Sequence, residues 1–555
     1  MSGKTTKKVL CVIMSVILVT SCIIPAFAAD NKCSRDDTPL LIISGFSQYQ
    51  LIDKRTGKSV WTPDEELILN AIEKALPALE TLLASDMTKN DFDVFCDDFI
   101  PAANELFSYI SCTPDGEPYD QNVGLINQFT GPVSDYDYAE VKQVFENDIV
   151  DIAVEAYGAD HVWVYGLDWR VDPLILADDI HDYIETMKAT TGHDKVAISG
   201  ISMGGCILSA YLSKYGYDDL SNITMLSSAF TGIEMVGALL CGEVEIDEQG
   251  LYNMINESIG KDTLSEVIAK TGILDKLLPV VDELIAYEKD RIYSECLIPS
   301  FGYITGIWAF VPDSRYSEAK EYMNIRMNEG TDEQNEIFWK RVDAYHYGVQ
   351  NKIADILTTA QDNGVCVSIV SNYNSQMPPI TTAGNYTGDQ VIETIHTSGF
   401  ATVAPYGETL DENYMRNAHL SSDRMIDAST CILPDNTWFI KNQRHVEFSN
   451  KGENDNSRFF AWILTAPADT NVNSNPDFPQ FMQYDRDTLT LSPLSSKMGD
   501  INASGNITVA DAKLVLKAIA GAEELTDAQA WVADINIDGK ISVVDAKLIL
   551  KMLVS

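Results

Sequence analysis

The chain has 555 residues, more than one ordinary domain requires, and its balance of 45% apolar and 22% charged residues excludes a largely disordered chain. Aspartate and glutamate number 82 against 39 lysines and arginines, which gives a formal net charge of −43 at pH 7. A surface this acidic repels phosphate backbones, so nucleic-acid binding is disfavoured, whereas an extracellular protein that handles neutral substrates or binds cations fits the charge.

Residues 1–29 have the composition of a secretory signal peptide. Three lysines among the first eight residues precede an apolar run, which ends in Ala26-Phe27-Ala28, a pattern of small residues that signal peptidase reads. A retained membrane anchor and a lipoprotein signal ending at Cys22 are the alternatives. Pro25 disfavours the first, and the apolar residues beyond Cys22 disfavour the second. We therefore expect a secreted protein without a transmembrane anchor after processing, because no other segment is apolar enough to span a bilayer.

Six apolar runs bounded by turn residues are predicted to be strands. They lie at residues 38–43, 161–165, 195–199, 223–226, 365–370 and 437–440. Apolar residues recur with helical spacing at 63–86 and 174–190. Strands that alternate with helices indicate a mainly parallel sheet covered on both faces, which is an α/β fold.

A long insertion, at about residues 230–360, separates the fourth and fifth predicted strands and is helical by pattern. Such an insertion in a sheet protein is typical of a cap over an active-site mouth. Within it, residues 298–310 are aromatic and apolar. They either line a groove for an acyl chain or form the core of the cap.

Gly200-Ile201-Ser202-Met203-Gly204 has the pattern of a nucleophile elbow. The pattern alone is weak, but a predicted strand precedes it and a helix rich in small residues follows, which is the setting that the elbow requires. We expect Ser202 to be the nucleophile and the amide of Met203 to be one donor of an oxyanion hole. Phe46, in the loop after the first strand, is expected to supply the second amide.

A serine nucleophile needs a histidine base and an acid that orients the base, in the chain order Ser, Asp or Glu, His. His445 directly follows the last predicted strand and is the expected base, with His419 as the alternative. Asp389 follows the fifth predicted strand and is the expected acid. Its rivals are Glu393 and Asp427.

Two segments resemble the lecithin:cholesterol acyltransferase family, which also includes lysosomal phospholipase A2-type enzymes. They are residues 43–61, and Tyr165-Gly166-Leu167-Asp168-Trp169-Arg170, which is similar to the family's Tyr-Asp-Trp-Arg segment with an insertion. Ser44 and Ile201 stand where the family usually has proline and histidine. The resemblance extends over most of residues 38–450. It implies an α/β-hydrolase fold with a large helical cap, and hydrolysis or transfer of acyl esters on lipids.

Eight cysteines remain after the two in the signal segment, and none of them forms a CxxC pair. A zinc site or a thioredoxin-type motif is therefore not indicated. Secretion permits disulfides, and Cys96 and Cys112 are close enough in sequence to form one. The equally good alternative is that both are buried free thiols.

The C-terminal residues 499–555 contain an internal repeat, in which the segment 500–514 recurs at 534–548. Each copy has the pattern of a calcium loop leading into a helix, with glycine at the sharp bend. Two structural calcium ions are expected, the first bound more weakly because Ser504 replaces a carboxylate; the alternative is a loop that folds without metal. The expected ligands are Asp500, Asn502, Ser504, Asn506 and Asp511, then Asp534, Asn536, Asp538, Lys540 and Asp545, where Asn506 and Lys540 act through their carbonyls.

This duplicated loop and helix resembles the type I dockerin family. The resemblance implies a module that binds a cohesin domain of a scaffoldin and carries a secreted protein into a cellulosome-type complex. The positions expected to recognise the cohesin are Val509-Ala510 and Val543-Val544.

These expectations divide the chain into a signal peptide at 1–29, an α/β-hydrolase domain at 30–468, a linker at 469–497 and a small all-α dockerin domain at 498–555. The leading functional hypothesis is an extracellular serine ester hydrolase, either a lipase or esterase or an acyltransferase, that uses no cofactor in catalysis and is attached to a scaffoldin. One alternative is a carbohydrate esterase that removes acetyl or feruloyl groups from plant polysaccharide. The other is a non-catalytic binding component that retains the hydrolase fold.

Overall fold

The computed structural model describes the chain except for its N-terminus and several short segments. The residues outside the description are 1–37, 62, 64, 146, 248–249, 252–273, 412–418, 450–453, 495–497, 503–506, 526, 537–538 and 554–555. The expected signal peptide and three of the expected calcium ligands, Ser504, Asn506 and Asp538, therefore lie outside the described residues.

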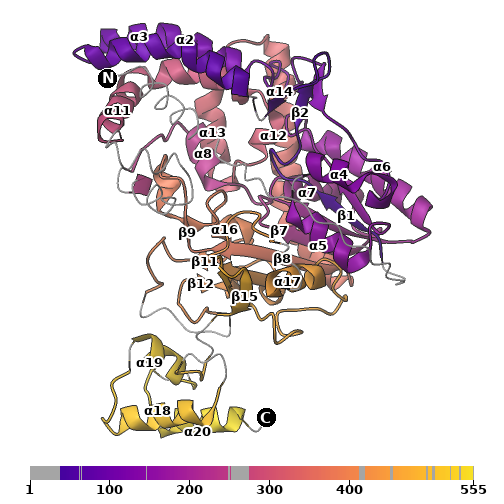
Figure 1. The fold of residues 1–555 in the computed structure, drawn as a ribbon, viewed down its shortest axis with the longest axis vertical. Helices are drawn as coiled ribbons and strands as arrows, with labels where there is room; N and C mark the ends of the chain where they lie inside the picture. Colours follow the sequence, from indigo (N-terminus) through magenta and orange to yellow (C-terminus); the bar gives the residue numbers. More distant parts are fainter. Residues whose placement is uncertain are drawn as a thin grey trace.

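A mainly parallel sheet of eight strands lies at the centre of the larger part of the molecule (Figure 1). The strands follow the order β15-β14-β13-β8-β7-β6-β1-β5, and every neighbouring pair is parallel except β14 with β15. They are β1 (Leu40–Ile43), β5 (Val162–Tyr165), β6 (Val196–Ile201), β7 (Leu220–Leu226), β8 (Cys366–Tyr373), β13 (Thr437–Lys441), β14 (Phe481–Asp485) and β15 (Thr490–Pro493). Strands lie at all six predicted positions, so the α/β class is confirmed.

Helices cover both faces of this sheet, and alternate residues of a strand face the two covers. In β1, Leu40 and Ile42 belong to the apolar cluster that contains residues of α5 and α17, whereas Leu41 and Ile43 belong to the cluster of α6 and α7. All four side chains are fully buried, which explains why the parallel strands appear in the sequence as continuous apolar runs. The covering helices are α5 (Asp148–Tyr157), α6 (Pro173–Thr191), α7 (Gly204–Tyr215), α15 (Ile353–Asp362) and α17 (Asp455–Ile463).

Helix α6 illustrates how the local sequence sets the ends of an element. Asp172 caps its N-terminus by accepting a hydrogen bond from the amide of Leu174, and Pro173 occupies the first turn, where its missing N–H would have no partner. Gly192 ends the helix in the left-handed conformation (φ 75°), which glycine adopts without a steric penalty.

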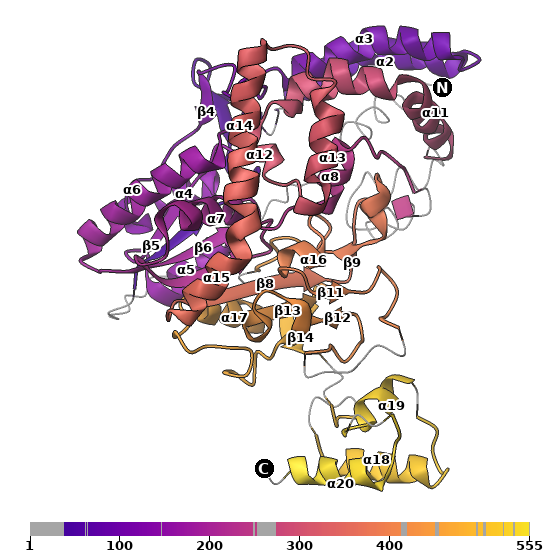
Figure 2. The same ribbon diagram turned by 180° about the vertical axis from the view of Figure 1, so that it is seen from behind.

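A helical cap lies beyond one edge of the sheet and comes from two separate parts of the chain. The predicted insertion supplies α8 (Glu234–Leu240), α11 (Leu274–Ile292), the π-helix η2 (Tyr293–Gly302), α12 (Thr305–Trp308), α13 (Asp313–Asn324) and α14 (Asp332–Gly348). The earlier helices α2 (Glu65–Ala84) and α3 (Lys89–Phe107) pack on each other, and α3 also packs on α11 (Figures 1 and 2). The cap is thus larger than the predicted 230–360, because α2 and α3 bury their apolar faces against that insertion.

Short elements complete the larger part of the molecule. They are the sheet of β2 (Leu51–Asp53), β3 (Lys58–Trp61) and β4 (Val123–Leu125), the pairs β9 (Ser375–Gln376) with β10 (Thr387–Gly388) and β11 (Thr402–Val403) with β12 (Ile426–Asp427), and the helices α4 (Tyr138–Val144) and α16 (Thr394–Thr397). Across the described part of the chain, every helix is too short or too polar to traverse a membrane.

The segment predicted as a linker, residues 469–497, contains the last two strands of the sheet. β14 pairs in parallel with β13, where Phe439 lies opposite Phe481, and β15 returns antiparallel to β14. Only alternate residues of β14 are buried, so this strand lacks the continuous apolar run that marks the central strands. The sheet therefore ends at Pro493, beyond the predicted domain boundary at 468.

The C-terminal part is a small helical unit with its own core (yellow in Figure 1). It contains α18 (Val509–Ile519), α19 (Asp527–Ala533) and α20 (Val543–Met552), and α18 packs alongside α20. Val515, Trp531 and Ile549 are central to its apolar cluster, and each is less than a tenth exposed. The unit contacts the sheet part through Leu420, which packs on this cluster, and through Arg424, whose guanidinium lies 5.1 Å from the Trp531 ring.

The seven cysteines in the described residues are all free thiols. Cys96 is buried in α3 and Cys112 is buried after it, and the two do not form a disulfide. Desolvation by burial raises the pKa of both thiols to about 12, which is typical of structural rather than reactive cysteines. Of the two alternatives for this pair, the buried free thiols are therefore the one present in the structure.

Candidate active site

Ser202 lies at a sharp turn between β6 and α7, with a backbone φ of 52°. A residue other than glycine pays about 1–3 kcal/mol to adopt such a left-handed conformation, so neighbouring bonds must hold it. The Ser202 amide donates to the carbonyl of Leu226 (3.1 Å), and the Ser202 carbonyl accepts from the amides of Gly205 (3.1 Å) and Ala229 (3.0 Å). The side chain is held in this strained turn at the carboxyl end of a central strand.

The glycines around Ser202 are required by close packing. A methyl group added to Gly204 would approach the carbonyl oxygens of Ile43 and Ser44 to 2.6 Å. A methyl group added to Gly205 would overlap the side chain of Ser228. Helix α7 can therefore approach β1 and the loop after β7 only because its first turn lacks side chains, as the elbow pattern predicts.

Asp389 and His445 form a hydrogen-bonded pair, although 56 positions separate them in sequence. The Nδ1 of His445 lies 2.8 Å from the Oδ2 of Asp389, and the His445 amide donates to the Asp389 carbonyl at 2.9 Å. The other carboxylate oxygen, Oδ1, accepts from the amides of Val391 (3.0 Å) and Ile392 (2.8 Å). Asp389 is fully buried, so this carboxylate has a fixed orientation. An ionised carboxylate only accepts, so the proton stays on Nδ1 and Nε2 remains free to accept another.

The two halves of the candidate site meet through Asn372 near the end of β8. Its side-chain amide donates to the hydroxyl of Ser227 (3.1 Å), in the loop that follows β7, and to the carbonyl of Arg444 (3.2 Å), which precedes His445. Within the described residues, the Ser202 hydroxyl and the His445 ring form no hydrogen bond with each other. Such contacts are commonly long in active sites and tighten in the reacting complex.

Two amides beside Ser202 are available as donors. A methyl group on Gly45 would lie 2.8 Å from the Cβ of Ser202, so the loop that contains Phe46 touches the serine. Among the described residues, no acceptor pairs with the amide of Phe46 or with the amide of Met203, whereas the Gly45 amide donates to Gln48 at 2.6 Å. Unpaired amides next to a serine are what an oxyanion hole requires.

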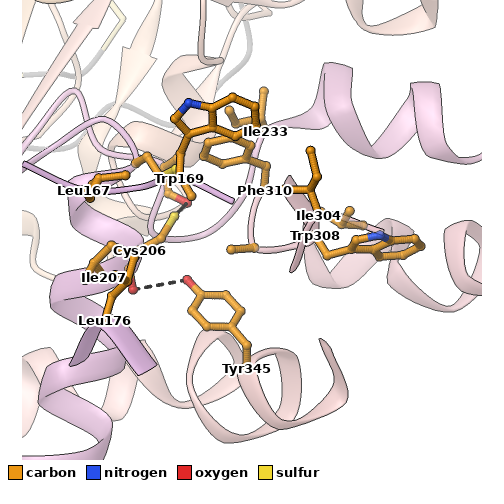
Figure 3. Packing of buried hydrophobic residues seen from close by; sticks show 14 of the residues in the cluster. Leu167, Trp169, Leu176, Cys206, Ile207, Ile233, Ile304, Trp308, Phe310 and Tyr345 are labelled. Carbon is orange, nitrogen blue, oxygen red and sulfur yellow. Dashed lines mark hydrogen bonds between the residues drawn. The ribbon is translucent and has the colours of Figure 1, made fainter. Parts of the chain in front are cut away.

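An aromatic cluster adjoins these amides. The ring of Phe46 lies 4.7 Å from Trp169, 5.8 Å from Trp61 and 6.2 Å from Phe310 (centroid distances). Figure 3 shows Trp169, Ile233 and Phe310 together above α7. Most of the apolar segment 298–310 is buried within the cap, and Phe310 is the residue that extends it to Phe46. The segment is therefore mainly cap core.

The segment that resembles Tyr-Asp-Trp-Arg is held in place by an ion pair. Arg170 is fully buried and pairs with Asp168, with 2.6 Å between Nη2 and Oδ2, and it also donates to the Val123 carbonyl at 3.0 Å. Burial lowers the pKa of Arg170, but the hydrogen bonds and charge of Asp168 outweigh burial and raise it. The ion pair stiffens the loop after β5, the bond to Val123 ties this loop to β4, and Trp169 lies between the two paired residues and beside Phe46.

The rival acids and the rival base occupy other places. Asp427 accepts from the amide of Ser429 at 2.9 Å and caps a short helix. His419 lies 3.1 Å from Gln480 through Nδ1. Glu393 accepts from backbone amides of α8 and is taken up below. Asn372 was not predicted from the sequence, and its place as a polar residue near the end of an apolar strand was the available signal. Trp169 and Phe310 lie in two segments that the sequence had already singled out.

The C-terminal loops bury four carboxylates. Asp500, Asp511, Asp534 and Asp545 are each at most 2% exposed. The last carboxylate of each loop is held alike, because Asp511 accepts from the amides of Asn502 and Thr508, and Asp545 from those of Asn536 and Ser542. A set of buried oxygen donors fits a hard cation such as calcium. Asp500, Asn502, Asp511, Asp534, Asn536, Lys540 and Asp545 are the expected ligands in the described residues.

One further group of metal-binding residue types lies on α6 and at the start of β7. His181, Glu185 and Asp219 place one ligand atom each within 4.8 Å of one another. Lys188 pairs with both carboxylates, at 2.6 and 2.5 Å, and supplies their counter-charge. A lysine therefore already serves as the cation between the two carboxylates of this cluster.

Comparison with known proteins identifies the C-terminal module. The type I dockerin domain family matches residues 498–554. Domains of this family bind calcium and bind cohesin domains of scaffoldins, so the chain carries the module for attachment to an extracellular, cellulosome-type complex. No curated protein matches the chain.

One solved structure with some similarity is described as "The crystal structure of Tle4-Tli4 complex". It is 14% identical, and the match covers 37% of this chain and 48% of that chain with a TM-score of 0.18. The match thus spans about half the length of that chain, and a score this low supports no conclusion about fold or function.

Proposed function

We propose that the sheet part of the chain is a serine ester hydrolase of the α/β-hydrolase type, with Ser202, His445 and Asp389 as its triad. The observation that carries this proposal is the buried hydrogen bond between Asp389 and His445, since both follow strands at the sheet edge where Ser202 sits in a strained turn. The chain order of nucleophile, acid and base is that of α/β-hydrolases.

In this mechanism the Ser202 hydroxyl attacks the carbonyl carbon of an ester and gives its proton to Nε2 of His445. Asp389 keeps the ring oriented and stabilises the imidazolium that forms. The amides of Phe46 and Met203 stabilise the tetrahedral oxyanion. His445 then returns the proton to the leaving alcohol, which leaves an acyl-enzyme on Ser202. Water, or a second alcohol, attacks the acyl-enzyme by the same steps in reverse.

The aromatic residues beside the oxyanion amides favour an acyl chain as the group that is recognised. Phe46, Trp61, Trp169 and Phe310 pack together as an apolar cluster, and apolar side chains beside a reacting serine suit the chains of lipid esters. The resemblance to the lecithin:cholesterol acyltransferase family points the same way. The dockerin favours the second candidate, an esterase that releases acetyl or feruloyl groups from polysaccharide.

A fluorophosphonate probe tests the proposal, because it reacts with activated serines. We expect the wild type to be labelled and Ser202→Ala not to be labelled, while Ser213→Ala, at an exposed position of α7, is labelled like the wild type. A folded wild type that resists the probe would refute the activated serine and favour a non-catalytic binding component. Rates on esters of increasing chain length, compared with acetate release from acetylated xylan, then separate the two substrate classes.

A further inference from the structure

A buried polar network lies between the turn that contains Asp389 and the cap. Glu393 is fully buried, and its carboxylate accepts from the amides of Glu234 (2.9 Å) and Met235 (3.0 Å), the first two residues of α8. The turn itself is tight, because Asp389 donates from its amide to the Ile392 carbonyl at 3.1 Å. One end of this turn therefore orients His445, and the other end is fastened to the cap.

Helix α8 continues this connection towards the serine. The amide of Ile233, which precedes α8, donates to the Phe310 carbonyl at 2.6 Å, and both residues belong to the apolar cluster drawn with Trp169 in Figure 3. On its other side, the Glu234 carboxylate pairs with Arg315 of α13 at 2.5 Å. Helix α8 is thus held in place by three partners: the apolar cluster around Phe310, the cap helix α13 and the turn that contains Asp389.

A helix cap alone does not require a buried glutamate. Serine or asparagine at the N-cap position of α8 would accept from the same amides, without the free-energy cost of burying a carboxylate. Desolvation by burial raises the pKa of Glu393, and the opposing effects of His396 and of the two α8 amides do not cancel that rise. The glutamate side chain is long enough to span the gap between the two elements. It therefore connects α8 of the cap to the turn that begins at Asp389.

We propose that Glu393 is a positioning residue that couples the seating of the cap to the placement of Asp389. When α8 lies in its place, its two amides hold Glu393 and with it the turn in which Asp389 orients His445. When α8 moves away, the turn loses both bonds, and the acid loses its fixed position. This inference rests on the proposed function for its effect on catalysis, but the mechanical coupling exists independently of activity.

Two variants and one control test the coupling. Glu393→Gln keeps the shape of the side chain and can accept from one amide, but its NH₂ group faces the other amide. Arg315→Met frees α8 from α13 and leaves Glu393 intact. Glu321→Gln changes an exposed carboxylate on α13 and serves as the control.

In the full-length protein, we expect Glu393→Gln to lower kcat and the rate of fluorophosphonate labelling by roughly tenfold or more, since small misplacements of catalytic groups have effects of this size. KM for a short ester should change less than twofold. Arg315→Met should lower kcat as well, and the two effects should be non-additive in the double variant. A kcat of Glu393→Gln equal to that of the control, or strict additivity, would overturn the proposal.

Hydrogen exchange separates this inference from the proposed function. The amides of Val391 and Ile392 are bonded to Asp389, and we expect them to exchange faster in Arg315→Met, a variant that changes neither the turn nor Glu393. Unchanged exchange in this variant would refute the coupling even if the enzyme is active. Faster exchange in a protein that resists the fluorophosphonate probe would refute the hydrolase and leave the coupling standing. Should Glu393→Gln fail to fold, Arg315→Met alone gives both readouts.

Discussion

The substitution Asp389→Asn separates the orientation of His445 from the integrity of the turn. In the wild type, one carboxylate oxygen accepts from the amides of Val391 and Ile392, and the other accepts from His445. Asparagine has one oxygen and one NH₂ group. If the oxygen keeps the two backbone bonds, the NH₂ group faces Nδ1 and turns it into an acceptor. The proton of the neutral ring must then lie on Nε2, which can no longer accept from Ser202.

The expected magnitudes differ for catalysis and for stability. An imidazole held in the wrong tautomer lowers kcat by roughly 10⁴-fold, which corresponds to about 5 kcal/mol of transition-state stabilisation. Folding should be affected little, because both backbone bonds persist. Asp389→Ala removes the acceptor altogether and leaves the amides of Val391 and Ile392 unpaired. The Ile392 amide is buried, at a cost of about 1–3 kcal/mol, so this variant should also be less stable.

Hydrolysis of a short p-nitrophenyl ester and the urea unfolding curve measure the two effects on the same preparations. We expect Asp389→Asn to be nearly inactive but as stable as the wild type. Asp389→Ala should be both inactive and less stable. An Asn variant that keeps a tenth or more of the wild-type kcat would show that Asp389 does not set the tautomer of His445. In that case the contact between these residues would have only a structural role.

Three further results are expected. Gly205→Ala should lose about 1–3 kcal/mol in urea unfolding, because its methyl group overlaps Ser228, whereas Gly348→Ala, with open space around it, should not; equal losses would contradict the close packing. Calcium chelation should abolish cohesin binding and the dockerin fold but leave serine labelling unchanged, and retained binding would contradict structural calcium. Burial outweighs Asp313 and lowers the pKa of His346, so its contribution to stability is present above about pH 6.5 and is lost as the pH falls through the lowered pKa. His346→Gln should flatten this loss in thermal unfolding at pH 5 to 7.5, and an unchanged slope would contradict it.

The sequence predicted the central strands well because their environment is uniform. Both faces of β1, β6 and β8 are covered and every residue is buried, so β1 is an unbroken apolar run and β6 and β8 are mostly apolar. Strand β14, next to the edge strand β15, is buried only at alternate positions, so its sequence lacks the apolar run that would distinguish it from a loop. Helix α2 was predicted at 63–86 and α3 was not predicted, and the place of both in the cap depends on contacts with a segment that follows much later in the chain.

The candidate site shows the same division between local and long-range information. Ser202 lies in a short motif whose glycines are required by close local packing, so this segment alone was enough to predict the nucleophile. Asp389 and His445 were chosen by chain order, and the rivals Glu393, Asp427 and His419 differ from them only in what they contact. Asn372 and Arg315 act through partners far along the chain. The place of Asn372 near the end of an apolar strand is a weak local signal, and no local pattern marks Arg315.

The order of strands has a consequence for biosynthesis. Asp389 follows β8, and His445 follows β13, which pairs with β8 only after nearly the whole sheet part has been made. A chain that is still emerging, or one cut before residue 437, therefore contains Ser202 and its turn but lacks His445. Under the proposed function, the triad is completed by one of the last strands to join the sheet, so unfinished or clipped molecules would be chemically inert.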